Sequence, residues 1–265
     1  MDDWRFCRAL FGYYRSLAIM KLLLLSFLSL FAMAAPVGSQ SSAEAALSVD
    51  DSLSLNISQK AVDLIVYYEV GGRKSFEKSY KRPIVPAWQT TQSGVTVCLG
   101  FDAGHNTPQQ IQKAFEGIIS QEKINLLKSV SGMKGANAYY NGLPKVKHLL
   151  SFEYEEAEKV FKRDSLPRFS KQTSDAFKLS KDRLHPHSNG ALVSLVFNRG
   201  ASMSSSSSRN EMRYIRTHIA NNQDSKIPSE FKSMKRLWNY SSLKGLHLRR
   251  DAEAKLFQDG LDARN

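Results

Sequence analysis

Residues 61–72 read AVDLIVYYEVGG, and this stretch decides the expected fold. Ser58 is a good N-cap, and the apolar residues after it recur at helical spacing, which predicts a helix over residues 59–69 with one buried stripe. Gly71-Gly72 would end that helix and place Glu69 in its last turn. A helix C-terminus disfavours negative charge, and partial burial would act in the same direction, so Glu69 has the setting of a general acid.

A second stretch, residues 93–105, reads SGVTVCLGFDAGH. Apolar residues alternate with small or polar ones over residues 95–100, which predicts a short strand with one buried face. The other face would present the hydroxyl of Thr96 and the thiol of Cys98. Asp102 follows a glycine. Its carboxylate either lines a nearby cleft or caps the turn.

A glycosidic bond can be cleaved by two carboxylic acids that come from different elements and face the same cleft. Glu69 would protonate the leaving oxygen. Asp102, with Thr96, would stabilise the positively charged oxocarbenium-like state or orient a water. This chemistry needs no metal and no cofactor. His185-Pro186-His187 is expected to be a loop and not a ligand pair, because no acid cluster lies nearby.

The composition predicts one domain with a sizeable core, since the chain has 265 residues of which 42% are hydrophobic. The formal net charge is +12, and +10 remains when residues 1–34 are removed. So basic a protein is attracted to anionic polymers such as cell-wall polysaccharides, lipopolysaccharide or nucleic acid, unless the charge only aids solubility.

Residues 1–34 are expected to be a secretory signal peptide, with Met20 as a possible true start. A charged beginning and an apolar run lead to Ala32-Met33-Ala34, a small-x-small cleavage site. The run is too short to span a bilayer, so we expect an exported protein, periplasmic or secreted, with no stable membrane anchor; the alternative is an anchor that is never cleaved. Residues 35–56 read as a flexible leader, and residues 57–265 as the catalytic domain.

The rest of the chain is mainly helical in pattern. Residues 191–198 are apolar nearly all round, which is typical of a helix buried at the centre of a helical lobe. Residues 73–92 lose periodicity and are expected to be loop-rich, and the serine run at residues 204–208 is expected to be a mobile loop. Helices are expected over residues 108–128, 142–150, 153–163, 167–178, 189–198, 209–221, 228–239 and 248–258.

Four motifs occur in an order that resembles the phage-type lysozymes: the Glu69 helix, residues 94–102, the helix at residues 191–198, and the ending at residues 245–253. Their spacing looks most like the pesticin branch, over roughly residues 57–258. The resemblance implies an α+β, mainly α, lysozyme-like fold. A small β-sheet lobe would join a larger helical lobe around a buried central helix. It also implies a muramidase that cleaves the β-1,4 bond between N-acetylmuramic acid and N-acetylglucosamine.

The resemblance also implies roles for single residues. Glu69 matches the general acid, and Thr96 matches the threonine that holds the attacking water. The phage enzymes have their aspartate six residues before that threonine, where this chain has Thr90. Asp102, six residues after Thr96, matches the pesticin arrangement instead. Cys98 stands where these families usually have glycine. The positions expected to contact substrate are Gly100, Phe101, His105 and Asn198, although His105 also reads as a polar loop residue.

The implied partners are peptidoglycan glycan strands, together with anionic envelope polymers at the basic surface. We expect a monomer that binds no nucleic acid and either remodels the wall or acts as an exported antibacterial factor. One alternative is a non-catalytic binder of glycan or nucleic acid that uses Trp88, Tyr139 and Tyr140. The other is a thiol hydrolase of wall peptides, with Cys98 as nucleophile and His105 or His187 as base. A thiol inside a strand makes that alternative weak.

Overall fold

Helix α2 (Gln59–Val70) forms as the sequence predicts. The Ser58 side chain accepts a hydrogen bond from the N–H of Ala61, and Gly71 ends the helix in the left-handed region at φ 76°. Glu69 therefore lies one residue before the helix end. The computed structural model describes residues 55–264, so the predicted signal peptide and nearly all of the leader lie outside the described residues.

A second helix, α3 (Gly72–Ser79), starts directly after Gly71 and corrects the expectation of a loop-rich segment from residue 73. Only Phe76 of this helix is buried, which is too little for a periodic signal. Its ring lies 5.7 Å from the ring of Tyr154, edge to face. Tertiary packing therefore decides a segment for which local propensity is neutral.

The predicted strand is a hairpin. β1 (Thr96–Val97) pairs antiparallel with β2 (Phe101–Asp102), so that Thr96 lies opposite Asp102 and Val97 opposite Phe101. The chain reverses at Cys98, which adopts φ 54°. The thiol is therefore buried, and the expectation that it shares the outward face of Thr96 is wrong, because alternation is lost where the chain turns.

The remaining structure within residues 55–264 is helical. The expected helix at residues 108–128 is two helices, because Gly117 at φ 69° breaks it. The helix expected to end at residue 163 continues through a π-helical turn, Phe161–Ser165, into the next. The other helices are α4 (Pro108–Phe115), α5 (Gln121–Lys128), α6 (Gly135–Asn137), α7 (Leu143–Val146), α8 (Tyr154–Val160), α9 (Leu166–Phe177), α10 (Pro186–Arg199), α11 (Asn210–Ala220), α12 (Ile227–Ser233) and α13 (Tyr240–Asp262).

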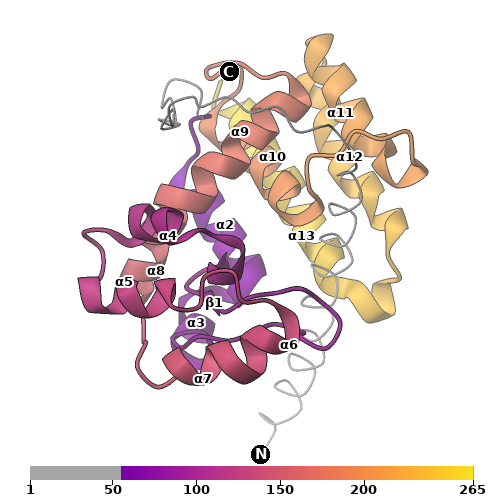
Figure 1. Cartoon of the computed structure of the whole chain (residues 1–265). Helices are drawn as coiled ribbons and strands as arrows, with labels where there is room; N and C mark the ends of the chain where they lie inside the picture. The colour runs from indigo at the N-terminus through magenta and orange to yellow at the C-terminus, as the bar shows by residue number, and fades with distance from the viewer. Residues whose placement is uncertain (1–54, 265) are drawn as a thin grey trace, which may run out of the picture.

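Helix α10 is the centre of the larger lobe, as the apolar run predicts. Every residue from Ser188 to Arg199 is buried, and α10 packs on α13, α2 and α9. Figure 1 shows α10 enclosed by α9, α11, α12 and α13, while β1 and helices α3 to α8 form a separate smaller lobe. The expected α+β, mainly α, fold with a small sheet and a central buried helix is confirmed. No helix within residues 55–264 is long and apolar enough to cross a membrane.

The contact between α10 and α2 makes a stability prediction. A Cβ added to Gly190 would lie 2.1 Å from the Cβ of Ala61. We expect Gly190→Ala to destabilise the protein by about 1–3 kcal/mol, as overpacking does, measured from the urea midpoint. Ala61→Gly alone removes a helix-favouring side chain and also destabilises. The double variant should nevertheless be more stable than Gly190→Ala, and simple additivity of the two losses would contradict this packing.

Candidate active site

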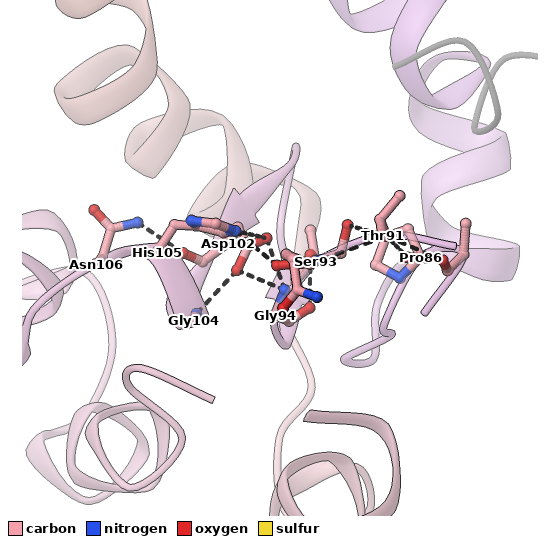
Figure 2. A network of polar contacts seen from close by, with 11 residues as sticks. Pro86, Thr91, Ser93, Gly94, Asp102, Gly104, His105 and Asn106 are labelled. Carbon is pink, nitrogen blue, oxygen red and sulfur yellow. Dashed lines mark hydrogen bonds and ion pairs between the residues drawn. The ribbon is translucent and has the colours of Figure 1, made fainter. Parts of the chain in front are cut away.

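Asp102 is held by backbone amides on two sides. The Gly94 N–H donates to both carboxylate oxygens, at 3.1 Å to Oδ1 and 2.9 Å to Oδ2. The Gly104 N–H donates to Oδ1 at 2.9 Å, so Asp102 caps the 3₁₀ turn Ala103–His105. Figure 2 shows the carboxylate between these two glycines, with the Asn106 side chain on its backbone oxygen. Of the two roles that the sequence left open for Asp102, the structure therefore shows turn capping.

The surroundings of Asp102 favour its protonated form. Burial raises the pKa of this carboxyl above 3.8, and the Gly94 amide, the charge of His105 and the Gly104 amide oppose that rise only in part. His105 Nε2 lies 4.0 Å from Asp102 Oδ2 and 2.8 Å from the backbone oxygen of Gln92. His105 is exposed, so its imidazole lies at the solvent side of the carboxylate.

Glycine is required at 94 and 104 because two backbone segments nearly touch there. A Cβ at Gly94 would lie 2.4 Å from Asp102 Oδ1, and a Cβ at Gly104 would lie 2.1 Å from the backbone oxygen of Met133. In the sequence, the signal of this close approach is the recurrence of glycine on both sides of the hairpin.

Thr96 and Asp102 are the two predicted site residues that the hairpin brings together. They face each other across β1 and β2, and opposite residues of an antiparallel pair project from the same side of the sheet. The Thr96 hydroxyl donates to the backbone oxygen of Gly94 at 3.2 Å. Gly94 therefore contacts Thr96 through its oxygen and Asp102 through its N–H.

Glu69 is held by an arginine that the sequence analysis did not connect with it. Arg249 Nη1, from α13, donates to Glu69 Oε1 at 2.9 Å across 180 residues of sequence. The Glu69 side chain is 11% exposed and that of Arg249 is 1% exposed. A neighbouring cation favours an ionised carboxylate, which acts against the effect of the helix end.

Arg249 belongs to a buried ionic cluster. Glu253 Oε1 accepts from Arg249 Nε at 3.1 Å, from Arg250 Nη2 at 2.9 Å and from Ser194 Oγ at 2.6 Å. Burial alone would lower the pKa of Arg249, but the charges of Glu69 and Glu253 outweigh this effect and raise the pKa above its ordinary value. Burial lowers the pKa of Arg250 to about 10, so both guanidinium groups are charged at neutral pH.

The residues expected to contact substrate divide into two pairs. Gly100 and His105 are exposed beside the hairpin. Phe101 is buried, with its ring 4.9 Å from the ring of Phe115, and Asn198 is buried with its Oδ1 accepting from Arg250 at 3.1 Å. The two buried side chains offer no surface to a ligand here and instead support the hairpin and the ionic cluster.

Cys98 has a structural role, and the His185-Pro186-His187 segment, which was expected to be a loop, instead begins helix α10. The Cys98 side chain is buried, and burial raises the pKa of its thiol well above the ordinary value. His185 caps α10 by accepting a hydrogen bond from the N–H of His187. Within residues 55–264 no three His, Cys, Asp or Glu side chains form a group that could hold a metal ion.

A comparison with family models matches residues 113–253, just over half of the chain, to the family described as phage lysozyme. The match runs from α4 to Glu253 in α13 and includes the central helix α10. It ends within the buried ionic cluster and leaves out α2 and the β1–β2 hairpin. No curated protein matches the chain.

The buried thiol makes a chemical prediction. Because nucleophilic attack requires the thiolate, whose formation burial disfavours, we expect Cys98 to resist iodoacetamide at pH 8 in the folded protein and to react in urea. Peptide mass mapping distinguishes Cys98 from Cys7. Rapid labelling of native Cys98, together with loss of a wall-degrading activity, would favour the thiol hydrolase instead.

Proposed function

Since the chain belongs to the phage lysozyme family, a family of cell-wall hydrolases, we propose that it is a muramidase that cleaves the β-1,4 bond between N-acetylmuramic acid and N-acetylglucosamine in peptidoglycan. Family membership supports a glycoside hydrolase with peptidoglycan as substrate. The finer assignment is carried by Glu69, a partly accessible carboxylate at a helix end that is fixed by a buried arginine.

Glu69 is proposed as the general acid. Its carboxyl gives a proton to the glycosidic oxygen as the bond from that oxygen to the anomeric carbon breaks. A water then adds to the anomeric carbon and gives its proton to the Asp102 carboxylate, and exchange with solvent restores both acids to their starting forms. Arg249 holds Oε1 of Glu69 and so limits the orientations of the carboxyl group. Fixed geometry of this kind is what makes a catalytic group effective.

Thr96 and Asp102 are proposed to act on the water or on the positive charge. Because both project from the same side of the hairpin, a hydroxyl and a carboxylate are available to one water. An ionised Asp102 would stabilise the oxocarbenium-like state electrostatically. The position of Asp102 after the threonine is the one the pesticin branch has, and we propose that arrangement for this chain.

Gly100 and His105 are proposed to border the bound glycan, with Phe101 and Asn198 supporting them from the core. We further propose that residues 1–34 are removed on export, that residues 35–56 are a leader, and that residues 57–265 act as a monomeric catalytic domain. The +12 formal charge would hold this domain near anionic envelope polymers.

The second candidate is a non-catalytic peptidoglycan-binding protein of the same fold. Two observations favour it. The amides of Gly94 and Gly104 already use the Asp102 carboxylate as a cap, and Cys98 adopts a left-handed conformation at a position where glycine is usual in these families. The next experiment separates the two candidates.

Glu69→Gln should abolish hydrolysis while binding to the wall is retained. Loss of a general acid costs about 10²–10⁴-fold in rate. The measurement is release of muropeptides from purified peptidoglycan, with products identified by mass and by their muramic-acid reducing ends. Glu155→Gln is the matched control, because Glu155 is an exposed glutamate paired with Arg73.

Thermal unfolding should show that Glu69→Gln remains folded, since an amide oxygen can still accept from Arg249. Equal muropeptide release by wild type and Glu69→Gln would refute the assignment of Glu69. If neither protein releases muropeptides but both bind the wall, the non-catalytic candidate is correct.

The pH dependence of hydrolysis should report Asp102. Since the folded pKa of this carboxyl lies above 3.8, the acid limb of kcat should also lie above pH 3.8. The positive charge of His105 lowers the pKa of Asp102, so His105→Gln should move the acid limb to higher pH. An unchanged limb, or one at lower pH, would exclude Asp102 as its source.

The raised pKa of Asp102 also predicts how the stability of the protein changes with pH. The folded protein holds the Asp102 proton more tightly than the unfolded chain does. The contribution of this group to stability therefore falls as pH rises from 3.8 to the folded pKa, and stays constant above it.

A further inference from the structure

Three aromatic side chains form a partly exposed cluster on the smaller lobe, here called the aromatic platform: Trp88, which is half-buried, and the exposed Tyr139 and Tyr140. The Trp88 and Tyr139 rings stack at 4.3 Å with 14° between their planes, and the Tyr140 ring stands edge-on to Trp88 at 5.0 Å. Tyr140 is 61% exposed and Tyr139 is 37% exposed. Large aromatic side chains usually bury their area in the core, so two exposed tyrosines against a half-buried tryptophan indicate a binding surface.

The backbone under the platform is unusual. Tyr139 and Tyr140 lie in a π-helical turn, Ala138–Gly142, which buries Ala138 and Gly142 and directs the two tyrosines outward. Such turns are rare and occur frequently at functional sites. Trp88 follows Ala87, which adopts φ 43°. The local conformation therefore presents the two tyrosine rings to solvent, while Trp88 packs partly against the core.

The platform is attached to the Asp102 hairpin. The Gly135 N–H, at the start of α6, donates to the backbone oxygen of Ser93 at 2.9 Å. Gly94, the next residue, donates its N–H to the Asp102 carboxylate. Figure 2 shows Ser93 and Gly94 beside Asp102 in the same network. The platform segment and the Asp102 carboxylate are thus joined through two adjacent backbone residues, Ser93 and Gly94.

Basic side chains are frequent on the segments that carry the platform. Residues 78–101 and 123–152 together contain eight Lys and Arg side chains and no Asp or Glu, although Glu153, which follows directly, pairs with Lys81 at 2.9 Å. The two segments lie together, because the Phe152 N–H donates to the Lys81 oxygen at 2.9 Å and Arg82 Nη1 donates to the Lys147 oxygen at 3.3 Å. Lys134, Lys145 and Lys147 are exposed. Their charge complements a polymer that bears carboxylates.

We propose that the aromatic platform is a glycan-binding subsite that extends the candidate active site along the peptidoglycan strand. The face of a pyranose ring carries C–H groups with partial positive charge, which complement the negative face of an aromatic ring. The exposed lysines bind the carboxylates of the same strand. The choice of peptidoglycan as the glycan rests on the proposed muramidase function, whereas stacking on sugar rings is independent of catalysis.

The test measures binding without hydrolysis. In the Glu69→Gln background, retention on purified peptidoglycan sacculi is compared for Tyr139→Ala/Tyr140→Ala and for Tyr214→Ala, whose side chain is 51% exposed on α11. The platform variant should bind about 10-fold more weakly, in line with the loss of a stacking contact, and the control should not change. Tyr140→Trp should keep the affinity, because it retains an aromatic face.

In the catalytically intact protein, the platform variant should raise KM and leave kcat unchanged, because it removes uniform binding. Equal sacculus retention by the platform and control variants would overturn the proposal. Loss of all binding at high salt by every variant would also overturn it, since only charge would then act. A 10-fold loss on an oligonucleotide but not on sacculi would assign the platform to nucleic acid instead.

Failure of the proposed function gives a different pattern. If wild type does not hydrolyse sacculi while the platform variant still binds them 10-fold more weakly, the subsite stands and the muramidase assignment falls. Hydrolysis with an unchanged KM in the platform variant would leave the enzyme assignment intact and remove the subsite.

Discussion

The ion pairs of Glu253 are the interaction on which the arrangement of the larger lobe depends. Its Oε1 accepts from Arg249, Arg250 and Ser194, and the side chains of all three charged residues are at most 1% exposed. Taking such ions out of water costs several kcal/mol each unless they are paired and hydrogen-bonded. Helices α10 and α13 must therefore stay together in one register, because any displacement would leave a buried charge without its partner.

That register sets the place of Glu69. Arg249 uses its Nε for Glu253 and its Nη1 for Glu69, so one guanidinium group ties α2 to the centre of the lobe. Glu69 is the partly exposed acid of this cluster, whereas Glu253 is fully buried. Asp102 is held differently, by the amides of a hairpin in the other lobe. Each carboxylate is thus oriented by its own lobe.

The local features of the fold could be read from the sequence, and the long-range ones could not. Ser58, the apolar spacing and Gly71 determine α2, and the apolar run predicts α10, because both signals lie within a few residues. The alternation around Thr96 predicted an extended segment correctly but could not show a reversal at Cys98, whose positive φ is atypical of its residue type. The Glu69–Arg249 contact spans 180 residues, and no local pattern encodes it.

The buried ionic cluster lies inside the part of the chain that matches the family model, and the proposed site residues lie outside it. Ser194, Arg249, Arg250 and Glu253 all lie within residues 113–253, whereas Glu69, Thr96 and Asp102 lie before them. The matched part of the chain therefore contains the buried cluster that binds Glu69, and the three proposed site residues lie before it. Arg249 lies inside the matched part of the chain and binds one oxygen of Glu69, which lies outside it, so the position of Glu69 is set by a side chain that belongs to the matched part.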